Sequence, residues 1–260
     1  MKGIYLAFVS CLLLGSLEAL SQGAYEIQVY ASPVMPKGAT IVELHSNYTI
    51  KGNKLVIEGV RPTYRALNET IEVTTGVLKN YEMGFYLYQS IPDSGGYTVV
   101  GVNFRHRVQV PNEWNWPVGV SLSAEVGYQK RDYNISPWNG EIRPIVDKQI
   151  KNLYLALNPT LELSFQNNDE KGEAVQFAPN FKAYYLLTQV IGIGFETYHN
   201  FGPVFNWSSS ELQEHQIFAT VDLFWSPLWE FNVGLGWGLN DNTDPLVAKL
   251  ILGRRFGLKR

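Results

Sequence analysis

Cysteine is nearly absent from this chain, and so are long apolar runs. The single cysteine, Cys11, lies in a short apolar stretch near the N-terminus, so the rest of the chain can form neither a disulfide nor a thiolate metal site. No later segment approaches the roughly 20 consecutive apolar residues that a membrane-spanning helix requires. These two absences exclude a disulfide-stapled domain and a helical membrane protein.

Charged residues are also scarce. They make up 17% of the 260 residues, whereas about 25% is usual in soluble domains. Hydrophobic residues make up 45% and aromatic residues 13%, which is too apolar for a disordered chain. The formal net charge of -3 offers no basic surface, so no nucleic-acid partner is expected. This composition is typical of a transmembrane β-barrel, whose strands alternate lipid-facing and lumen-facing residues.

The first 21 residues have the pattern of a secretory signal peptide. Lys2 supplies the positive charge, residues 4–14 form the apolar region, and Ala19-Leu20-Ser21 is a small-residue cleavage site. We predict cleavage after Ser21, which leaves residues 22–260 as a single outer-membrane β-barrel domain.

Apolar and polar residues alternate along most of the predicted mature chain. Residues 40–50, for example, place Val42, Leu44, Tyr48 and Ile50 on one face and Glu43, His45, Asn47 and Thr49 on the other. No helical period follows the signal. The pattern predicts an all-β fold, a transmembrane antiparallel up-and-down barrel of about 12 strands, at residues 39–50, 66–76, 81–91, 98–110, 117–130, 139–148, 151–166, 173–186, 188–200, 212–225, 228–239 and 245–256.

The predicted connections alternate between long and short. Most odd-numbered connections are polar and contain glycine, proline, asparagine or aspartate, while most even-numbered ones are very short. Outer-membrane barrels have long extracellular loops and short periplasmic turns. The alternation therefore predicts that both ends of the mature chain lie on the periplasmic side.

Aromatic residues gather near the predicted strand ends, as expected for the interfacial girdles of a membrane barrel. They are Trp114, Trp116, Trp138, Trp225, Trp229, Trp237 and Phe256. The last strand alternates Leu246, Ala248, Leu250 and Leu252 with polar or small residues and closes on Phe256, which resembles the signal read by barrel-assembly machinery. Arg254 interrupts its apolar face, and four residues follow Phe256.

Five segments carry a resemblance to a known family: His45–Thr49, Pro117–Glu125, Glu141–Lys148, Asn158–Glu162 and Phe177–Lys182. Together they resemble Gram-negative outer-membrane barrels similar to the transporter-like proteins of the MetA pathway of phenol degradation. The resemblance covers nearly the whole mature chain. It implies passage of small compounds, hydrophobic or aromatic ones included, and fixes no catalytic residue.

The polar face of the strands predicts which residues line the lumen. A charged side chain facing lipid at the bilayer centre costs about 2–4 kcal/mol for a base, so most of these charges must face inward. Ten acids oppose six bases, which indicates a path that favours cations. The predicted lumen-lining residues are Glu43, His45, Glu72, Glu82, Arg105, Arg107, Glu125, Glu141, Arg143, Asp147, Glu162, Lys182, Glu196, Asp222, Glu230, Lys249 and Arg255. The same side chains could instead pair across a narrow barrel and fill it.

Signals for catalysis or metal binding are weak. His45 and Ser46 are adjacent in the sequence, and a histidine beside a serine is a possible hydrolase pair. Adjacent strand residues point to opposite faces, however, so His45 cannot activate Ser46. That a serine on another strand pairs with His45 remains an open alternative. His106, His199 and His215 show no metal-ligand spacing. Glu141 and Arg143 share one face and are expected to form an ion pair. We therefore expect no enzyme activity, no cofactor and no metal.

The sequence thus predicts a bacterial outer-membrane barrel that acts as a passive channel or transporter for a small solute. Its expected partners are outer-membrane lipid, the barrel-assembly machinery during biogenesis, and that solute. Three alternatives remain open: an outer-membrane lipid hydrolase, a structural barrel with a plugged lumen, and a soluble β-sandwich that binds a ligand.

Overall fold

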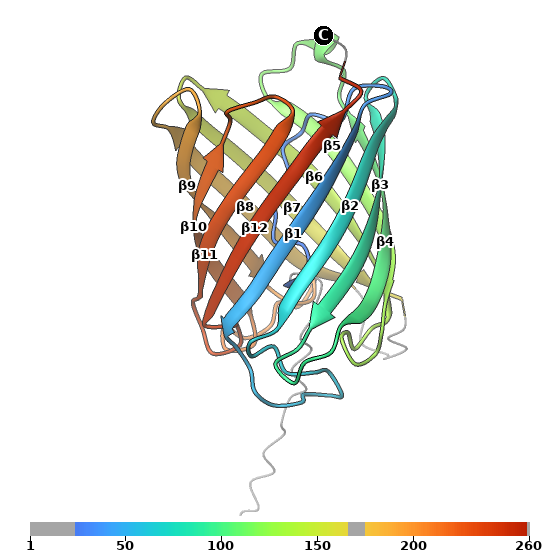
Figure 1. Cartoon of the computed structure of the whole chain (residues 1–260), viewed down its shortest axis with the longest axis vertical. Coiled ribbons are helices and arrows are strands. Elements are labelled where there is room, and N and C mark those ends of the chain that lie inside the picture. Colours follow the sequence, from blue (N-terminus) through green and yellow to red (C-terminus); the bar gives the residue numbers. More distant parts are fainter. Residues whose placement is uncertain (1–23, 166–174, 259–260) are drawn as a thin grey trace, which may run out of the picture.

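The chain forms one closed antiparallel β-barrel (Figure 1). The structure is a computed structural model, and it describes residues 24–165 and 175–258. The strands are β1 (Thr40–Lys51), β2 (Leu67–Leu78), β3 (Tyr81–Ile91), β4 (Thr98–Gln109), β5 (Gly119–Gln129), β6 (Trp138–Ile150), β7 (Leu153–Ser164), β8 (Val175–Leu186), β9 (Ile191–Asn200), β10 (Glu214–Leu223), β11 (Trp229–Gly238) and β12 (Leu246–Phe256).

Every strand pairs with its neighbours in the chain, and β12 returns to pair with β1. The closing ladder runs from Thr40 opposite Phe256 to Thr49 opposite Val247. The predicted all-β, twelve-stranded, up-and-down barrel is therefore confirmed. The largest error in a strand end is at β9, predicted to begin at residue 188 and found to begin at Ile191, because residues 187–190 form a turn. No helix among the described residues is long and apolar enough to cross a membrane.

The two ends of the barrel differ in their connections. At one end, which we call the turn end, β2–β3 and β6–β7 are joined by two residues each, and Asn80 and Lys151 adopt positive φ angles of 65° and 54°. Asparagine adopts this left-handed conformation more readily than most residues. The opposite end, the loop end, carries the long connections 52–66, 130–137 and 201–213. One turn-end connection is also long, since residues 110–118 include a short 3-10 helix, Asn112–Trp114.

The outer face of the barrel is apolar and has aromatic rings at both ends. Trp114, Trp116, Trp225, Trp229 and Phe256 lie exposed at or beside the turn end, and Trp138, Trp207 and Trp237 lie exposed at the loop end. The guanidinium of Arg254 lies over the Trp229 ring, 4.9 Å from its centroid, so the base that interrupts the last strand is held at the turn-end girdle.

Residues 24–38, which precede β1, run through the inside of the barrel, and we call them the lumen segment. Near the loop-end half, Asn47 donates to the carbonyl of Ala24 and Thr70 donates to that of Tyr25. Near the turn end, the Met35 backbone N–H donates to Glu82. The segment then leaves the lumen beside Gly76, to which Lys37 forms an isolated bridge.

β12 finishes at the turn end, whereas the residues before β1 do not remain there. That the turn end faces the periplasm stays a prediction. Residues 24–38 fold back into the barrel from the turn end and reach toward the loop end. Pro33 and Pro36 lack backbone N–H groups, which disfavours a ladder strand here. Barrel side chains therefore satisfy the backbone of the segment. The predicted signal peptide, residues 1–21, lies outside the described residues.

Candidate functional site

The interior of the barrel holds the charged side chains that the alternation assigned to the lumen. Fourteen of the seventeen predicted lumen-lining residues are buried. The buried set is Glu43, His45, Glu72, Glu82, Arg105, Arg107, Glu125, Glu141, Arg143, Asp147, Lys182, Glu196, Asp222 and Lys249. The other three, Glu162, Glu230 and Arg255, are half-buried.

Glu72, Glu82, Arg105 and Arg107, from β2, β3 and β4, form what we call the arginine cluster. The Arg105 guanidinium lies 2.7 Å from Glu72 and 3.2 Å from Glu82, and Arg107 lies 2.7 Å from Glu82. Thr74 accepts a further hydrogen bond from Arg105. The planar guanidinium has donors enough to serve several acceptors at once, which is why arginine rather than lysine joins two carboxylates here.

Tyr30 of the lumen segment is packed among arginines. The guanidinium carbons of Arg105 and Arg143 each lie 4.7 Å from its ring centroid, and that of Arg107 lies at 5.4 Å. Its hydroxyl donates to Glu26 of the same segment and lies 3.1 Å from the Tyr86 hydroxyl. Cation–π contacts strengthen when the cation is desolvated, so Tyr30 is the main side-chain anchor of the segment.

Across the lumen, Lys182, Glu196, Asp222 and Lys249, from β8, β9, β10 and β12, form what we call the lysine cluster. Lys182 lies 2.7 Å from Asp222 and 3.1 Å from Glu196, and Lys249 forms an ion pair with Glu196. Lys249 also donates to the carbonyl of Ile27 at 3.0 Å. This cluster joins four strands to each other, and its hydrogen bond to the lumen segment is accepted by a backbone carbonyl.

The remaining predicted residues make smaller contacts. The expected ion pair of Glu141 and Arg143 is confirmed, with Nε and Oε1 2.6 Å apart, and Arg143 also lies 3.7 Å from Glu26. Glu125 accepts from Asn103 at 2.6 Å. Glu230 and Arg255 form an ion pair close to the turn end.

His45 has a carboxylate as its neighbour and not a serine. Its Nε2 lies 3.2 Å from Glu72. Ser46 points to the outer face, as the strand period requires, where it donates to Glu69 at 2.8 Å. Within the described residues, His45 therefore lacks the contact to a serine hydroxyl that a hydrolase mechanism needs.

The lumen segment is the part of the site that the sequence reasoning missed. Its backbone is served by side chains from many strands: Asn158 bonds both the N–H and the carbonyl of Tyr30, and Asp147 accepts from the N–H and hydroxyl of Ser32. The sequence pattern that could have revealed it lies in residues 24–30, where Tyr25, Ile27 and Val29 alternate with polar residues outside any predicted strand.

Two glycines make room for this segment. A Cβ at Gly119 would lie 2.2 Å from both the Asp147 carboxylate and the Ser32 hydroxyl, and one at Gly76 would lie 2.3 Å from the carbonyl oxygens of Met35 and Pro36. A side chain at Gly76 would displace the backbone of the segment, whereas one at Gly119 would displace the Asp147 carboxylate and the Ser32 hydroxyl. Glycine is therefore favoured where the wall and the segment approach each other most closely.

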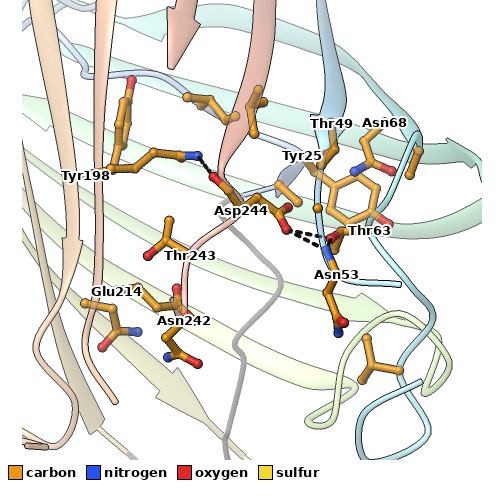
Figure 2. A pocket seen from close by; sticks show the side chains of 18 of the residues that line it. Tyr25, Thr49, Asn53, Thr63, Asn68, Tyr198, Glu214, Asn242, Thr243 and Asp244 are labelled. Carbon is orange, nitrogen blue, oxygen red and sulfur yellow. Dashed lines mark hydrogen bonds between the residues drawn. The ribbon is translucent and has the colours of Figure 1, made fainter. Parts of the chain in front are cut away.

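A cavity of about 470 Å³ lies between the lumen segment and the loop end. Figure 2 shows Asp244 from the β11–β12 connection beside Asn53 and Thr63 of the β1–β2 connection, with Glu214 and Asn242 lower in the same view. Asp244 accepts from the Thr63 hydroxyl at 2.6 Å and from the Asn53 N–H at 3.3 Å, so two long connections are tied together at its rim. We call this cavity the chamber.

The chamber is rich in carboxylates. In the described part of the chain, its lining includes the acids Glu26, Glu141, Glu162, Glu214, Asp241 and Asp244, the arginines Arg61 and Arg143, and the histidines His199 and His215. Burial raises the pKa of Asp244, while the hydrogen bonds from Thr63 and Asn53 oppose the shift. An excess of carboxylates in a confined space attracts cations and repels anions.

The closed barrel, its charged interior and its apolar outer face define the architecture of a channel-type β-barrel. Among solved structures, the chain is similar to the COG4313 outer membrane channel from Pseudomonas putida F1, with a TM-score of 0.61 and 12% identity over 89% of this chain and 100% of that chain. It is also similar to the NanC porin, with a TM-score of 0.54 and 8% identity over 84% of this chain and 100% of that one.

The KdgM porin gives a TM-score of 0.51 at 8% identity, over 84% of this chain and 99% of that chain. No protein-family description and no curated protein matches the sequence. At such low identities the likeness establishes a shared fold: this chain has the barrel fold of bacterial outer-membrane channels.

Proposed function

We propose that this protein lies in the bacterial outer membrane and acts as a passive channel for a small solute. The observation that carries the proposal is the contrast between its two surfaces. The outer face is apolar and bounded by aromatic rings at both ends, as lipid requires, while the inner face holds nearly all the charge of the strands. A closed barrel with an apolar outer face and a charged inner face separates lipid from a polar interior.

In the described state, the lumen segment closes the path. It occupies the interior from the chamber to the turn end and is held by the arginine cluster, by Asn158 and by Asp147. Permeation then requires residues 24–38 to shift or leave. We propose that the segment is a plug, and that the chamber above it receives the solute.

The charges of the chamber favour a cationic or polar small molecule. Six carboxylates against two guanidinium groups give the entrance a negative field, and about 470 Å³ suits a small organic compound. The same lining contains the aromatic side chains of Tyr25, Tyr133 and Tyr198, which would also suit a neutral aromatic solute. We propose that anions are disfavoured.

One alternative has specific support. The arginine and lysine clusters together with the lumen segment could fill the interior permanently, which would make the protein a structural barrel. A lipid hydrolase has less support, because His45 contacts Glu72 and the described residues provide no serine beside it.

A reversible crosslink separates a channel from a permanently filled barrel. A Cβ built at Gly119 would lie 3.3 Å from the Ser32 Cβ, close to the separation found in disulfides. We expect the double variant S32C and G119C to form a disulfide that fixes the segment to β5. The mature chain has no other cysteine if the signal is removed as predicted.

The measurement is conductance of the refolded protein in planar bilayers. We expect the oxidised double variant to conduct less than its reduced form, and the single variant S32C to be insensitive to reductant. A variant lacking residues 24–36 should conduct most. Equal conductance before and after reduction would reject the plug, and no conductance from the folded deletion variant would reject the channel.

A further inference from the structure

Three ligand-type side chains meet inside the barrel at β1 and β2, away from the chamber. Glu43 and His45 are two residues apart on β1 and share the inner face, and Glu72 stands directly opposite Glu43 on β2. One potential ligand atom from each residue lies within 4.8 Å of the others. Their exposed fractions are 5%, 0% and 0%.

The three side chains leave polar atoms without partners. Within residues 24–165 and 175–258, neither nitrogen of His45 has a hydrogen-bond partner, although Nε2 faces the Glu72 carboxylate at 3.2 Å. The Glu43 carboxylate is 5% exposed and lies directly opposite Glu72 on the neighbouring strand. Two carboxylates directly opposite each other repel, and unpaired buried polar groups are costly. A cation or a proton between the two carboxylates would remove this cost.

The nearby arginine does not supply that balance. Arg105 contacts Oε1 of Glu72, whereas His45 and the Tyr30 hydroxyl face Oε2. Arg105 and Arg107 are already shared between Glu72 and Glu82. The three carboxylates Glu43, Glu72 and Glu82 exceed these two guanidinium groups by one, so a further positive charge, on His45 or on a bound cation, would balance them.

We propose that Glu43, His45 and Glu72 bind one divalent transition-metal ion. One imidazole nitrogen and two carboxylate oxygens form a donor set that suits zinc and its first-row neighbours, and the imidazole disfavours magnesium or calcium. The bound ion joins β1 to β2 next to the ladder where β12 closes the barrel. The site stands apart from the proposed channel function, because it is read out by metal content and stability and not by conductance.

Zinc content of the purified full chain tests this site. His199 and His215 contact each other through their Nδ1 atoms and could bind zinc as well, so the test uses an H199Q/H215Q background. The protein is refolded with zinc or with chelator and freed of excess metal. We expect about one zinc per chain after refolding with zinc, and a higher midpoint of thermal unfolding than for the chelator-treated sample, since a ligand that binds only the folded state stabilises it.

Matched variants in this background locate the ion. E43Q and H45Q should each reduce zinc affinity at least tenfold and abolish the thermal shift, whereas H106Q, which removes an exposed histidine of β4, should change neither. Zinc retained by both E43Q and H45Q would overturn the proposal, as would a folded parent protein that takes up no zinc. The latter result would mean that a shared proton, and not a metal, lies between Glu43 and Glu72.

If a variant does not fold, the parent protein still tests the proposal. Cobalt added during refolding should give the parent protein visible absorption from nitrogen and oxygen ligands that zinc displaces. Absence of that absorption in a folded barrel would equally overturn the site.

Discussion

The arginine cluster and the lysine cluster face each other across the lumen but hold the lumen segment in different ways. The arginine side grips a side chain, with the Tyr30 ring packed against Arg105, Arg107 and Arg143. On the lysine side, Lys249 donates to the backbone carbonyl of Ile27, whose side chain packs against Phe218 and Val247. A planar guanidinium can stack on a ring while it still donates to carboxylates, and a compact ammonium cannot do both as well.

The difference indicates that the contacts of the segment with charged side chains lie mainly on the β2–β6 side of the barrel. The lysine cluster mainly ties strands β8 to β12 to one another. Variants on the arginine side should therefore affect both the segment and the wall, and variants on the lysine side should affect chiefly the wall.

The largest effect is expected from removing Arg105. The variant R105M leaves Glu72 buried without a permanent cation, and breaking a buried ion pair in this way costs about 3–5 kcal/mol. K249M should cost less, because Glu196 keeps Lys182 at 3.1 Å. The free energy of unfolding, measured by denaturant titration in lipid vesicles, gives both numbers. If the two losses were equal, the clusters would not differ as described.

A second comparison sets the outer face against the inner face of one strand. Leu250 faces outward and Lys249 is buried in the lumen. We expect L250R to cost about 2–4 kcal/mol if it lies near the bilayer centre, and K249R to cost less, since it keeps its charge in the polar interior. The same order should hold for arginine at Leu155, Leu161 and Val233 against Glu162 and Glu230. A reversed order would show that the register is shifted by one residue.

A third comparison separates the ring of Tyr30 from its hydroxyl. Y30F keeps the stacking on the arginines and loses the bonds to Glu26 and Tyr86, whereas Y30L loses both. We expect Y30L to be less stable than Y30F by about 1–2 kcal/mol, the range of a desolvated cation–π contact. Y30L should also raise conductance more than Y30F does. Identical behaviour would place the anchor of the segment elsewhere.

The smallest structural effect is expected from Glu125 and Glu162. Among the residues that the structure describes, neither of these acids forms an ion pair with an arginine. Glu125 contacts Asn103 and Ser123, and Arg105 and Arg143 pair with Glu72, Glu82, Glu141 and Glu26. E125Q and E162Q should change the unfolding free energy by less than about 1 kcal/mol, the net value of an ordinary hydrogen bond. They should reduce cation preference, measured as reversal potential in a salt gradient.

Acidification should act in the same direction. Because burial raises the pKa of Asp244, its negative charge is lost at a higher pH than that of an exposed aspartate. Cation preference should fall as the pH passes through that raised value, and D244N should weaken this pH dependence. A pH profile that is the same in D244N would assign the effect to other chamber acids.

The barrel could be predicted from the sequence because each strand carries its own evidence. Residues such as Val42 and Glu43 reveal their faces by alternation alone, and every strand pairs with a chain neighbour, so no long-range pairing had to be guessed except the closure of β12 on β1. The inward charges followed from the high cost of placing them in lipid.

The arrangement inside the lumen could not be predicted in this way. Alternation shows that Glu72 and Arg105 point inward, but which acid meets which base depends on the circumference and on what else occupies the space. Tyr30 and Glu26 have no strand pattern of their own, and His45 meets Glu72 only because the β1–β2 register places Glu72 opposite Glu43. A period of two contains no information about contacts across a barrel.

The position of the lumen segment also constrains the order of assembly. Residues 24–38 join β1 at the turn end and are wrapped by side chains from β2, β4, β6, β7 and β12. Because these contacts come from strands on both sides of the β12–β1 closure, we expect the segment to be placed among them before β12 pairs with β1. β12, the last strand to be synthesised, would then both close the barrel wall and enclose the lumen segment.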